Sequence, residues 1–179
     1  AQWASESDFA QWFWKSILSR DQLASPRDRV ARKLGVQLGD RMCSTISLDA
    51  FDAAEIPLLN DLTREGHLDI DQNRNTVRFS HELLADWARA RELQVQGTAV
   101  ATFLAARVSS PLWHRALRFH ALARLEQSAD AKAWLSLFEQ FRGNATVDEL
   151  AQNLLLEAAI FALDSAAILE RLWPTLEAN

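Results

Sequence analysis

The sequence contains little glycine, proline or cysteine, with five Gly, four Pro and one Cys among 179 residues. So few helix-breaking residues, beside abundant Ala, Leu, Arg and Glu, indicate a mostly helical fold. The single Cys43 excludes an internal disulfide framework, and we expect it to be a small buried residue in a reducing compartment. No apolar run approaches the roughly 20 residues that span a bilayer, so the sequence predicts a cytoplasmic protein without a membrane segment.

The rest of the composition is that of a folded protein, with 49% hydrophobic and 24% charged residues. The length suits one ordinary domain or two small ones. The chain opens at Ala1 on a Trp-bearing pattern that includes Trp3, and we expect it to be a piece of a longer polypeptide.

Residues 1–96 predict a winged-helix domain, which consists of three helices, a short strand and a β-hairpin wing. The first helix is expected over 7–19, because apolar residues recur there at helical spacing. Its predicted buried stripe is Phe9, Trp12, Phe13 and Ile17. The second helix has a clear start signal, Ser25 as N-cap followed by proline at the first helical position. Four basic residues are expected mostly off its apolar face: Arg27, Arg29, Arg32 and Lys33.

A β-branched run at 44–47 predicts the short strand. The third helix is expected to begin at Asp49 or Asp52 and to end at Gly66, since a glycine commonly follows the last helical turn. Alternating apolar residues around a turn-rich centre then predict the hairpin within 67–80. A further helix is expected over 81–94.

From residue 97 onward only helices are predicted, as a HEAT-like or superstructure-forming array over 97–179. The expected helices cover 98–108, 112–126, 129–141, 147–163 and 166–172. Trp113, Trp134 and Trp173 are expected to pack between helices, whereas an exposed tryptophan there would indicate a binding surface. The stretch 153–169 is apolar nearly all round, which predicts a buried helix or an interface.

Charge argues against nucleic-acid binding by the predicted winged helix. Residues 49–97 contain five Arg, no Lys and ten acidic residues, a net charge of −5. The third helix, which would enter the major groove in a DNA reader, is acidic and would be repelled by phosphates. Only Arg74 and Arg78 on the wing are locally basic. We therefore expect a protein-interaction or regulatory module.

His81 lies where the last wing strand gives way to a helix. Ser80 is a suitable N-cap for that helix, and the free N–H groups of a helix N-terminus favour anions. An imidazole in this first turn could donate a hydrogen bond to a phosphate oxygen. It could equally satisfy a neighbouring backbone group, and the residues alone leave both interpretations open.

The segment 58–93 resembles the winged-helix domain of STAND-class signalling NTPases, the NACHT and NOD-like receptor group with its bacterial relatives. That group ends its wing with apolar-x-Phe-x-His and continues into a helix rich in aromatic and small residues that closes on Ala-Arg. A Leu-x-x-Leu…Glu-Gly-x-Leu approach precedes the wing. The matching residues here are Leu59, Leu62, Glu65, Gly66, Leu68, Val77, Phe79, His81, Leu84, Trp87, Ala88, Ala90 and Arg91. The resemblance covers roughly residues 1–96.

In that family the wing histidine contacts the β-phosphate of bound ADP and holds the protein closed, so the resemblance implies this role for His81. It implies ADP or ATP, with Mg²⁺, held mainly by an upstream nucleotide-binding domain of the same polypeptide. The helical array would then receive a protein or small-molecule trigger, and ATP exchange would permit homo-oligomerisation. Bacterial defence signalling suits the family.

The chain contains no P-loop, because none of its five glycines precedes a lysine. We therefore expect no enzyme activity from the chain by itself, and an ATPase only in the longer polypeptide. His114 and His120, six residues apart, would lie on opposite helix faces and form no metal pair, and His67 is expected on the wing surface. Two alternative functions stay open, a winged-helix transcription regulator with a helical dimerisation or ligand domain, and a protein-interaction adaptor.

Overall fold

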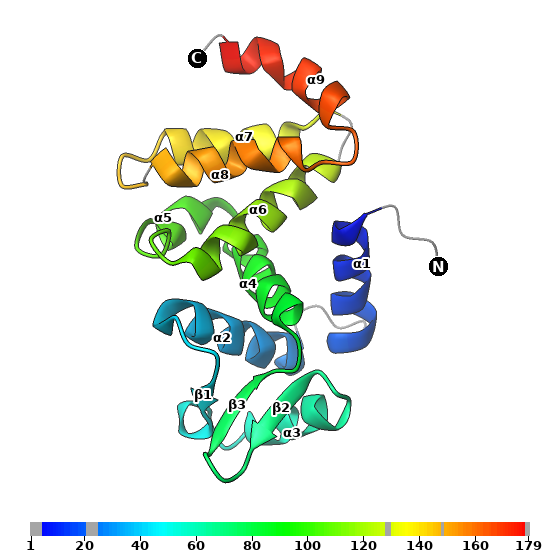
Figure 1. The fold of residues 1–179 in the computed structure, drawn as a ribbon, viewed down its shortest axis with the longest axis vertical. Helices are drawn as coiled ribbons and strands as arrows, with labels where there is room; N and C mark the ends of the chain where they lie inside the picture. Colours follow the sequence, from blue (N-terminus) through cyan, green and yellow to red (C-terminus); the bar gives the residue numbers. More distant parts are fainter. Residues whose placement is uncertain (1–4, 21–24, 128–129, 148, 178–179) are drawn as a thin grey trace. The chain divides into compact units, whose positions relative to one another are not determined.

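A computed structural model describes residues 5–20, 25–127, 130–147 and 149–177, apart from the side chain of Thr175. Trp3 and the predicted helix start at residue 129 lie outside the described residues. The chain is mainly helical with one small three-stranded antiparallel sheet (Figure 1). It divides into two compact units, Phe9–Glu92, here the sheet-bearing unit, and Ala1–Asp8 with Leu93–Asn179, here the helical unit.

The first helix has the predicted extent but not the predicted geometry. α1 (Glu6–Trp12) continues as a π-helix over Phe13–Leu18, in which the wider turn places Ser19 N 2.8 Å from Trp14 O, five residues back. The predicted stripe is only partly buried, and Trp12 is 39% exposed. The deeply buried residues are Ala10, Trp14 and Leu18. The indole N–H of Trp14 donates a buried hydrogen bond to the Asp28 carboxylate.

α2 (Pro26–Arg41) begins as predicted. The Ser25 hydroxyl accepts a hydrogen bond from Asp28 N at 3.1 Å, and proline occupies the first helical position, where no N–H is needed. The helix ends where Met42 takes a left-handed φ of 48°. Cys43 follows this turn and is half-buried rather than buried, with its thiol donating to Thr45 O at 3.2 Å.

α3 (Ile56–Arg64) begins later than predicted. Leu48–Ala50 form a 3₁₀ turn, and Asp52 N–H is capped by the Glu55 carboxylate at 2.8 Å. Pro57 has no N–H to bond to the carbonyl four residues earlier, so the regular α-helical pattern is delayed. At the far end Gly66 takes a φ of +80°, as expected for a glycine that ends a helix.

The predicted strand and hairpin are confirmed. β1 (Ile46–Ser47), β2 (Leu68–Asp71) and β3 (Thr76–Phe79) form a sheet in the order β1-β3-β2, all antiparallel. Leu68 pairs with Phe79, and both side chains are buried. α3 packs against β2, and Figure 1 shows the two elements next to each other. The most buried apolar residues of this unit are Leu18, Val30, Ala31, Leu34, Ile46, Leu59, Leu62, Leu68, Val77 and Ala88.

α4 (Glu82–Gln96) crosses the boundary between the two units in the sequence. In the helical unit a 3₁₀ turn at Gly97–Ala99 leads into α5 (Val100–Ala105), α6 (Pro111–Glu126), α7 (Lys132–Arg142), α8 (Glu149–Ile160) and α9 (Ser165–Glu177). α6 packs on α7 and α8, and α8 packs on α9. Trp113 and Trp134 are fully buried as predicted, and Trp134 Nε1 donates to Leu155 O at 3.2 Å.

Within the sheet-bearing unit, α2 and α4 approach each other closely at Gly35. A Cβ built on Gly35 would lie 2.7 Å from the Ala88 Cβ, which is attached directly to the backbone and cannot rotate away. The absence of a side chain at Gly35 therefore sets the separation of these two helices.

We expect Gly35→Ala to destabilise the protein, although alanine is the better helix former. Overpacking costs about 1–3 kcal/mol and the gain in helix propensity returns about 1 kcal/mol. Urea unfolding followed by circular dichroism should show the loss. The double variant Gly35→Ala, Ala88→Gly moves the Cβ to the other helix and should recover most of it. A Gly35→Ala variant that is more stable than wild type, as helix propensity alone would make it, would contradict the close approach.

Candidate functional site

His81 is the N-cap of α4 and not a residue of its first turn. Its Nδ1 accepts a hydrogen bond from Leu83 N–H at 3.2 Å, while Leu84 N–H lies 3.0 Å from the His81 carbonyl oxygen. The ring thus satisfies one of the four N–H groups that a helix start leaves without partners. The side chain is exposed.

This hydrogen bond determines which ring nitrogen carries the proton. When Nδ1 accepts from a backbone N–H, the neutral imidazole has its hydrogen on Nε2. His81 therefore combines an internal contact at Nδ1 with a donor at Nε2, at the positive end of a 15-residue helix. An acceptor oxygen of an anionic ligand is the partner that such a donor favours.

Ser80 is not the N-cap that the sequence predicts, because its hydroxyl is engaged elsewhere. Ser80 Oγ donates to the Gly66 carbonyl at 2.7 Å, and Ser80 N–H donates to the His67 carbonyl at 3.1 Å. These two bonds extend the β2–β3 pairing beyond Leu68 and Phe79 to the base of the hairpin. The position of His81 is therefore tied to residues 66 and 67.

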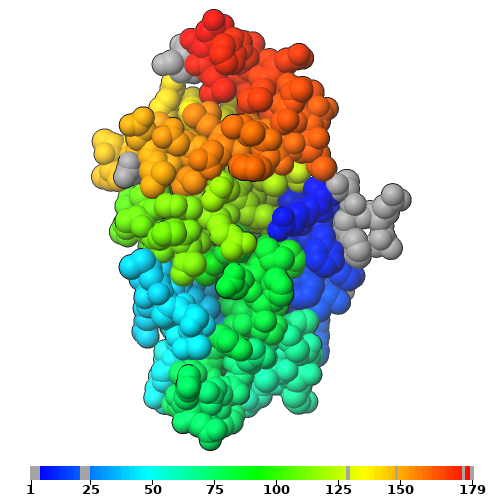
Figure 2. Space-filling view, viewed as in Figure 1, coloured from blue at the N-terminus to red at the C-terminus, as the bar shows by residue number. Residues whose placement is uncertain are grey.

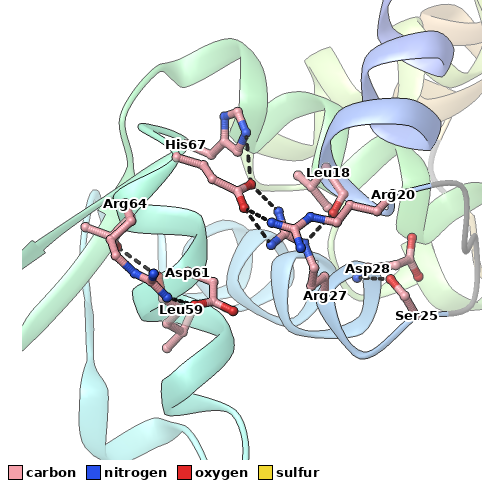
Figure 3. Close-up of polar contacts among 11 residues, drawn as sticks. Leu18, Arg20, Ser25, Arg27, Asp28, Leu59, Asp61, Arg64 and His67 are labelled. Atoms are coloured by element: carbon pink, nitrogen blue, oxygen red, sulfur yellow. Dashed lines mark hydrogen bonds and ion pairs between the residues drawn. The ribbon is translucent and has the colours of Figure 1, made fainter.

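Glu65 is the shared partner in a charged cluster beside this base, whose Arg20, Arg27 and His67 are labelled in Figure 3. Arg27 binds both carboxylate oxygens, with Nη1 3.0 Å from Oε1 and Nη2 bonded to Oε2, and Arg20 also donates to Oε1. Arg27 Nε donates to the Leu18 carbonyl at 2.8 Å. One guanidinium, only 7% exposed, thus joins the end of the π-helix, the start of α2 and the end of α3.

The cluster perturbs the ionisation of its members. Hydrogen bonds from Arg27, with a further one from Arg20, lower the pKa of Glu65 to about 2. Burial lowers the pKa of His67 below its usual value, although its Nε2 lies 3.7 Å from Glu65 Oε2. The His67 ring packs edge-on against Phe13 at 5.3 Å between centroids, so it is not the surface residue that the sequence predicts.

A second charged cluster surrounds Asp28, one residue further along α2. Its carboxylate is 2% exposed and accepts hydrogen bonds from Trp14 Nε1 at 2.7 Å, Arg32 Nε at 2.8 Å and Arg91 Nε at 3.3 Å. Arg32 also pairs with Glu92. The prediction that Arg27 lies off the buried face of α2 is wrong, and Asp28, about which the sequence predicts nothing, is buried beside it. The signal that could have indicated burial is Trp14, whose indole N–H needs an acceptor when buried.

The two basic residues of the hairpin are paired with acidic neighbours. Arg78 Nη2 lies 3.2 Å from Asp69 Oδ2, and Arg74 Nε lies 3.6 Å from Asp71 Oδ2. All four line a shallow hollow of about 450 Å³ on the sheet. These pairings compensate the only basic charges of the wing, so this surface lacks the excess positive charge that phosphates require.

The remaining histidines lie in α6 of the helical unit. His114 Nε2 lies 2.5 Å from the Val108 carbonyl oxygen. His120 is 4% exposed, and burial lowers its pKa to about 3. Across the part of the chain that the structure describes, no three His, Cys, Asp or Glu side chains are grouped to hold a metal ion. Nor is any described helix long and apolar enough to cross a membrane.

Trp173 differs from Trp113 and Trp134 because it is 60% exposed. It lies on α9, the red segment of Figure 2, one helical turn from Leu169, which is 38% exposed. Ile160, Phe161 and Leu163, at the end of α8 and in the following turn, are more than 60% exposed. The apolar stretch that the sequence assigned to a buried helix or an interface is thus only partly covered.

Comparisons of the chain with protein-family models, with curated proteins and with solved structures found no match.

We expect His120 to make the stability of the protein fall on acidification. Its pKa is about 3 when folded and about 6.5 when exposed, so between these values the unfolded chain binds more protons. The free energy of unfolding should rise with pH across this window, by at most about 1.4 kcal/mol per pH unit, and level off above it. Urea unfolding of wild type and His120→Leu between pH 4.5 and 7.5 tests this, since the variant lacks the contribution. Parallel pH profiles would contradict it.

Proposed function

We propose that this chain is the regulatory part of a STAND-class signalling NTPase, in which the sheet-bearing unit acts as a winged-helix domain. His81 would contact the β-phosphate of ADP and stabilise the closed, inactive state. The observation that carries this proposal is the hydrogen bond from Leu83 N–H to His81 Nδ1, which leaves Nε2–H as a donor on an exposed ring.

The order of elements supports the winged-helix interpretation. Two helical segments, a short strand, α3 and the β2–β3 hairpin follow one another as in that plan, and the hairpin leads directly into α4. The segment with the strongest resemblance, 59–93, runs from α3 into α4 and includes the whole hairpin. His81 lies at the junction where the family has its nucleotide-contacting histidine.

The remaining parts of the proposal concern the longer polypeptide. An upstream nucleotide-binding domain would hold ADP or ATP with Mg²⁺. It would also supply the P-loop, which this sequence does not contain, and with it the ATPase activity. The helical unit, as a repeat-like array, would receive a trigger and pass strain to the winged helix. ATP exchange would then release the closed form and permit oligomerisation. The paired arginines of the hairpin favour this function over DNA binding, and α3 itself carries one Asp and one Arg, with no excess of positive charge.

Two substitutions separate the capping role of His81 from phosphate contact. Asparagine is a good N-cap but is too short to present a donor in place of Nε2–H, whereas alanine provides neither function. We expect both His81→Asn and His81→Ala to reduce ADP retention by the longer polypeptide. Loss of one charge-assisted hydrogen bond should weaken affinity roughly ten- to hundredfold.

The measurement is the amount of ADP that co-purifies with each variant, with folding checked by circular dichroism. Arg74→Gln on the hairpin is the matched surface control and should retain ADP normally. If His81→Asn retains as much ADP as wild type, His81 is a helix cap only, and the adaptor function, which requires no nucleotide, gains support.

A further inference from the structure

Residues 65–67, at the base of the hairpin, are attached to the rest of the sheet-bearing unit on both sides of Gly66. The Glu65 carboxylate is bound by Arg27 and Arg20, and the His67 ring packs against Phe13. Gly66 itself makes no close contact where a Cβ would lie. This short segment is therefore positioned by the side chains that flank the glycine.

The same segment holds the residue before His81. Both hydrogen bonds of Ser80 end on it, one from the hydroxyl to the Gly66 carbonyl at 2.7 Å and one from N–H to the His67 carbonyl at 3.1 Å. Glu65 is covalently joined to Gly66, and Ser80 to His81. Two hydrogen bonds and two peptide units thus connect the Glu65–Arg27 ion pair to the ring that caps α4.

We propose that the Glu65–Arg27 ion pair is a latch that positions His81, and that displacement of Phe13–Arg20 opens it. Glu65 and Arg27 are positioning residues in this arrangement, because they act on His81 through residues 66 and 67 and Ser80. The consequence for nucleotide retention rests on the proposed function of His81, whereas the effect on the position of the ring does not.

Phe13–Arg20 is the segment whose displacement would open the latch, because it supplies three of the contacts that hold it closed. The Leu18 carbonyl accepts from Arg27 Nε, Arg20 donates to Glu65, and Phe13 packs on His67. A shift of this segment would therefore disturb Arg27, Glu65 and His67 together. The segment is largely a π-helix, a conformation that occurs frequently at functional sites.

The test compares Glu65→Gln with Arg64→Gln in the 179-residue chain. Arg64 is adjacent, its side chain is 77% exposed, and it pairs with Asp61 within α3, so it is a matched control outside the latch (Figure 3). Nitrogen-15 NMR of labelled histidine reports whether the proton of His81 resides on Nδ1 or Nε2. Hydrogen exchange at the Leu83 amide reports the capping bond directly.

In wild type and Arg64→Gln we expect the Nε2–H tautomer and a protected Leu83 amide. Glu65→Gln should mix the two tautomers and speed exchange at Leu83 roughly fivefold, the equivalent of about one net hydrogen bond. Unchanged His81 shifts and Leu83 exchange in a folded Glu65→Gln protein would overturn the latch. If Glu65→Gln does not fold, Arg20→Gln is the deciding variant, because it removes one exposed contact to Glu65. It should change the His81 tautomer and Leu83 exchange in the same direction, by a smaller amount. No change in Arg20→Gln would also overturn the proposal.

ADP retention in the longer polypeptide separates the latch from the function of His81. If His81→Asn and Glu65→Gln both lower retention, the latch acts on nucleotide binding as proposed. If His81→Asn lowers it and Glu65→Gln does not, the latch has no regulatory effect. If neither variant changes retention, the proposed function fails, and the NMR comparison alone decides whether the latch positions His81.

Discussion

The first turn of α2 buries two side chains of opposite charge, and the sheet-bearing unit depends on the partners that these charges require. Arg27 is 7% exposed and Asp28 1% exposed. Buried charges are tolerated only when they are paired and hydrogen-bonded, and removal of one partner typically costs about 3–5 kcal/mol. Asp28 therefore constrains Trp14 and Arg91, while Arg27 constrains Leu18 and Glu65. Two adjacent residues thus fix the π-helix, the end of α3 and α4.

Satisfying these charges also satisfies backbone groups at element ends. The Leu18 carbonyl is one of the acceptors that the end of a helix leaves unpaired, and the Arg27 guanidinium supplies its donor. The Ser25 hydroxyl caps α2 by accepting a hydrogen bond from Asp28 N–H. Asp28 therefore contributes its backbone to the helix cap and its side chain to the buried cluster. The interactions that stabilise the fold therefore coincide with those that determine where its elements begin and end.

Local signals in the sequence were sufficient for most of the elements. The Ser25-Pro26 start of α2, the hairpin and the left-handed Gly66 each depend on residues that are adjacent in sequence. The errors arose where a distant partner decided the outcome. Periodicity assigns Arg27 to a polar face, and nothing in its own segment indicates Glu65 as its partner. Ser80 was likewise predicted to be an N-cap from its neighbours in sequence, whereas its hydroxyl donates to the Gly66 carbonyl, 14 residues away.

The sequence predicted a role for His81, but it did not predict the geometry of the ring. The residues left open whether the ring serves the backbone or a phosphate. In the structure Nδ1 accepts from Leu83, and the proposed phosphate contact would use the other nitrogen, Nε2. Serine, aspartate or asparagine would cap α4 at least as well as histidine. Capping alone therefore gives no reason for an imidazole at this position. A second nitrogen that can donate from a fixed ring at a helix N-terminus does give one, because an anion is the partner that both the donor and the helix dipole favour.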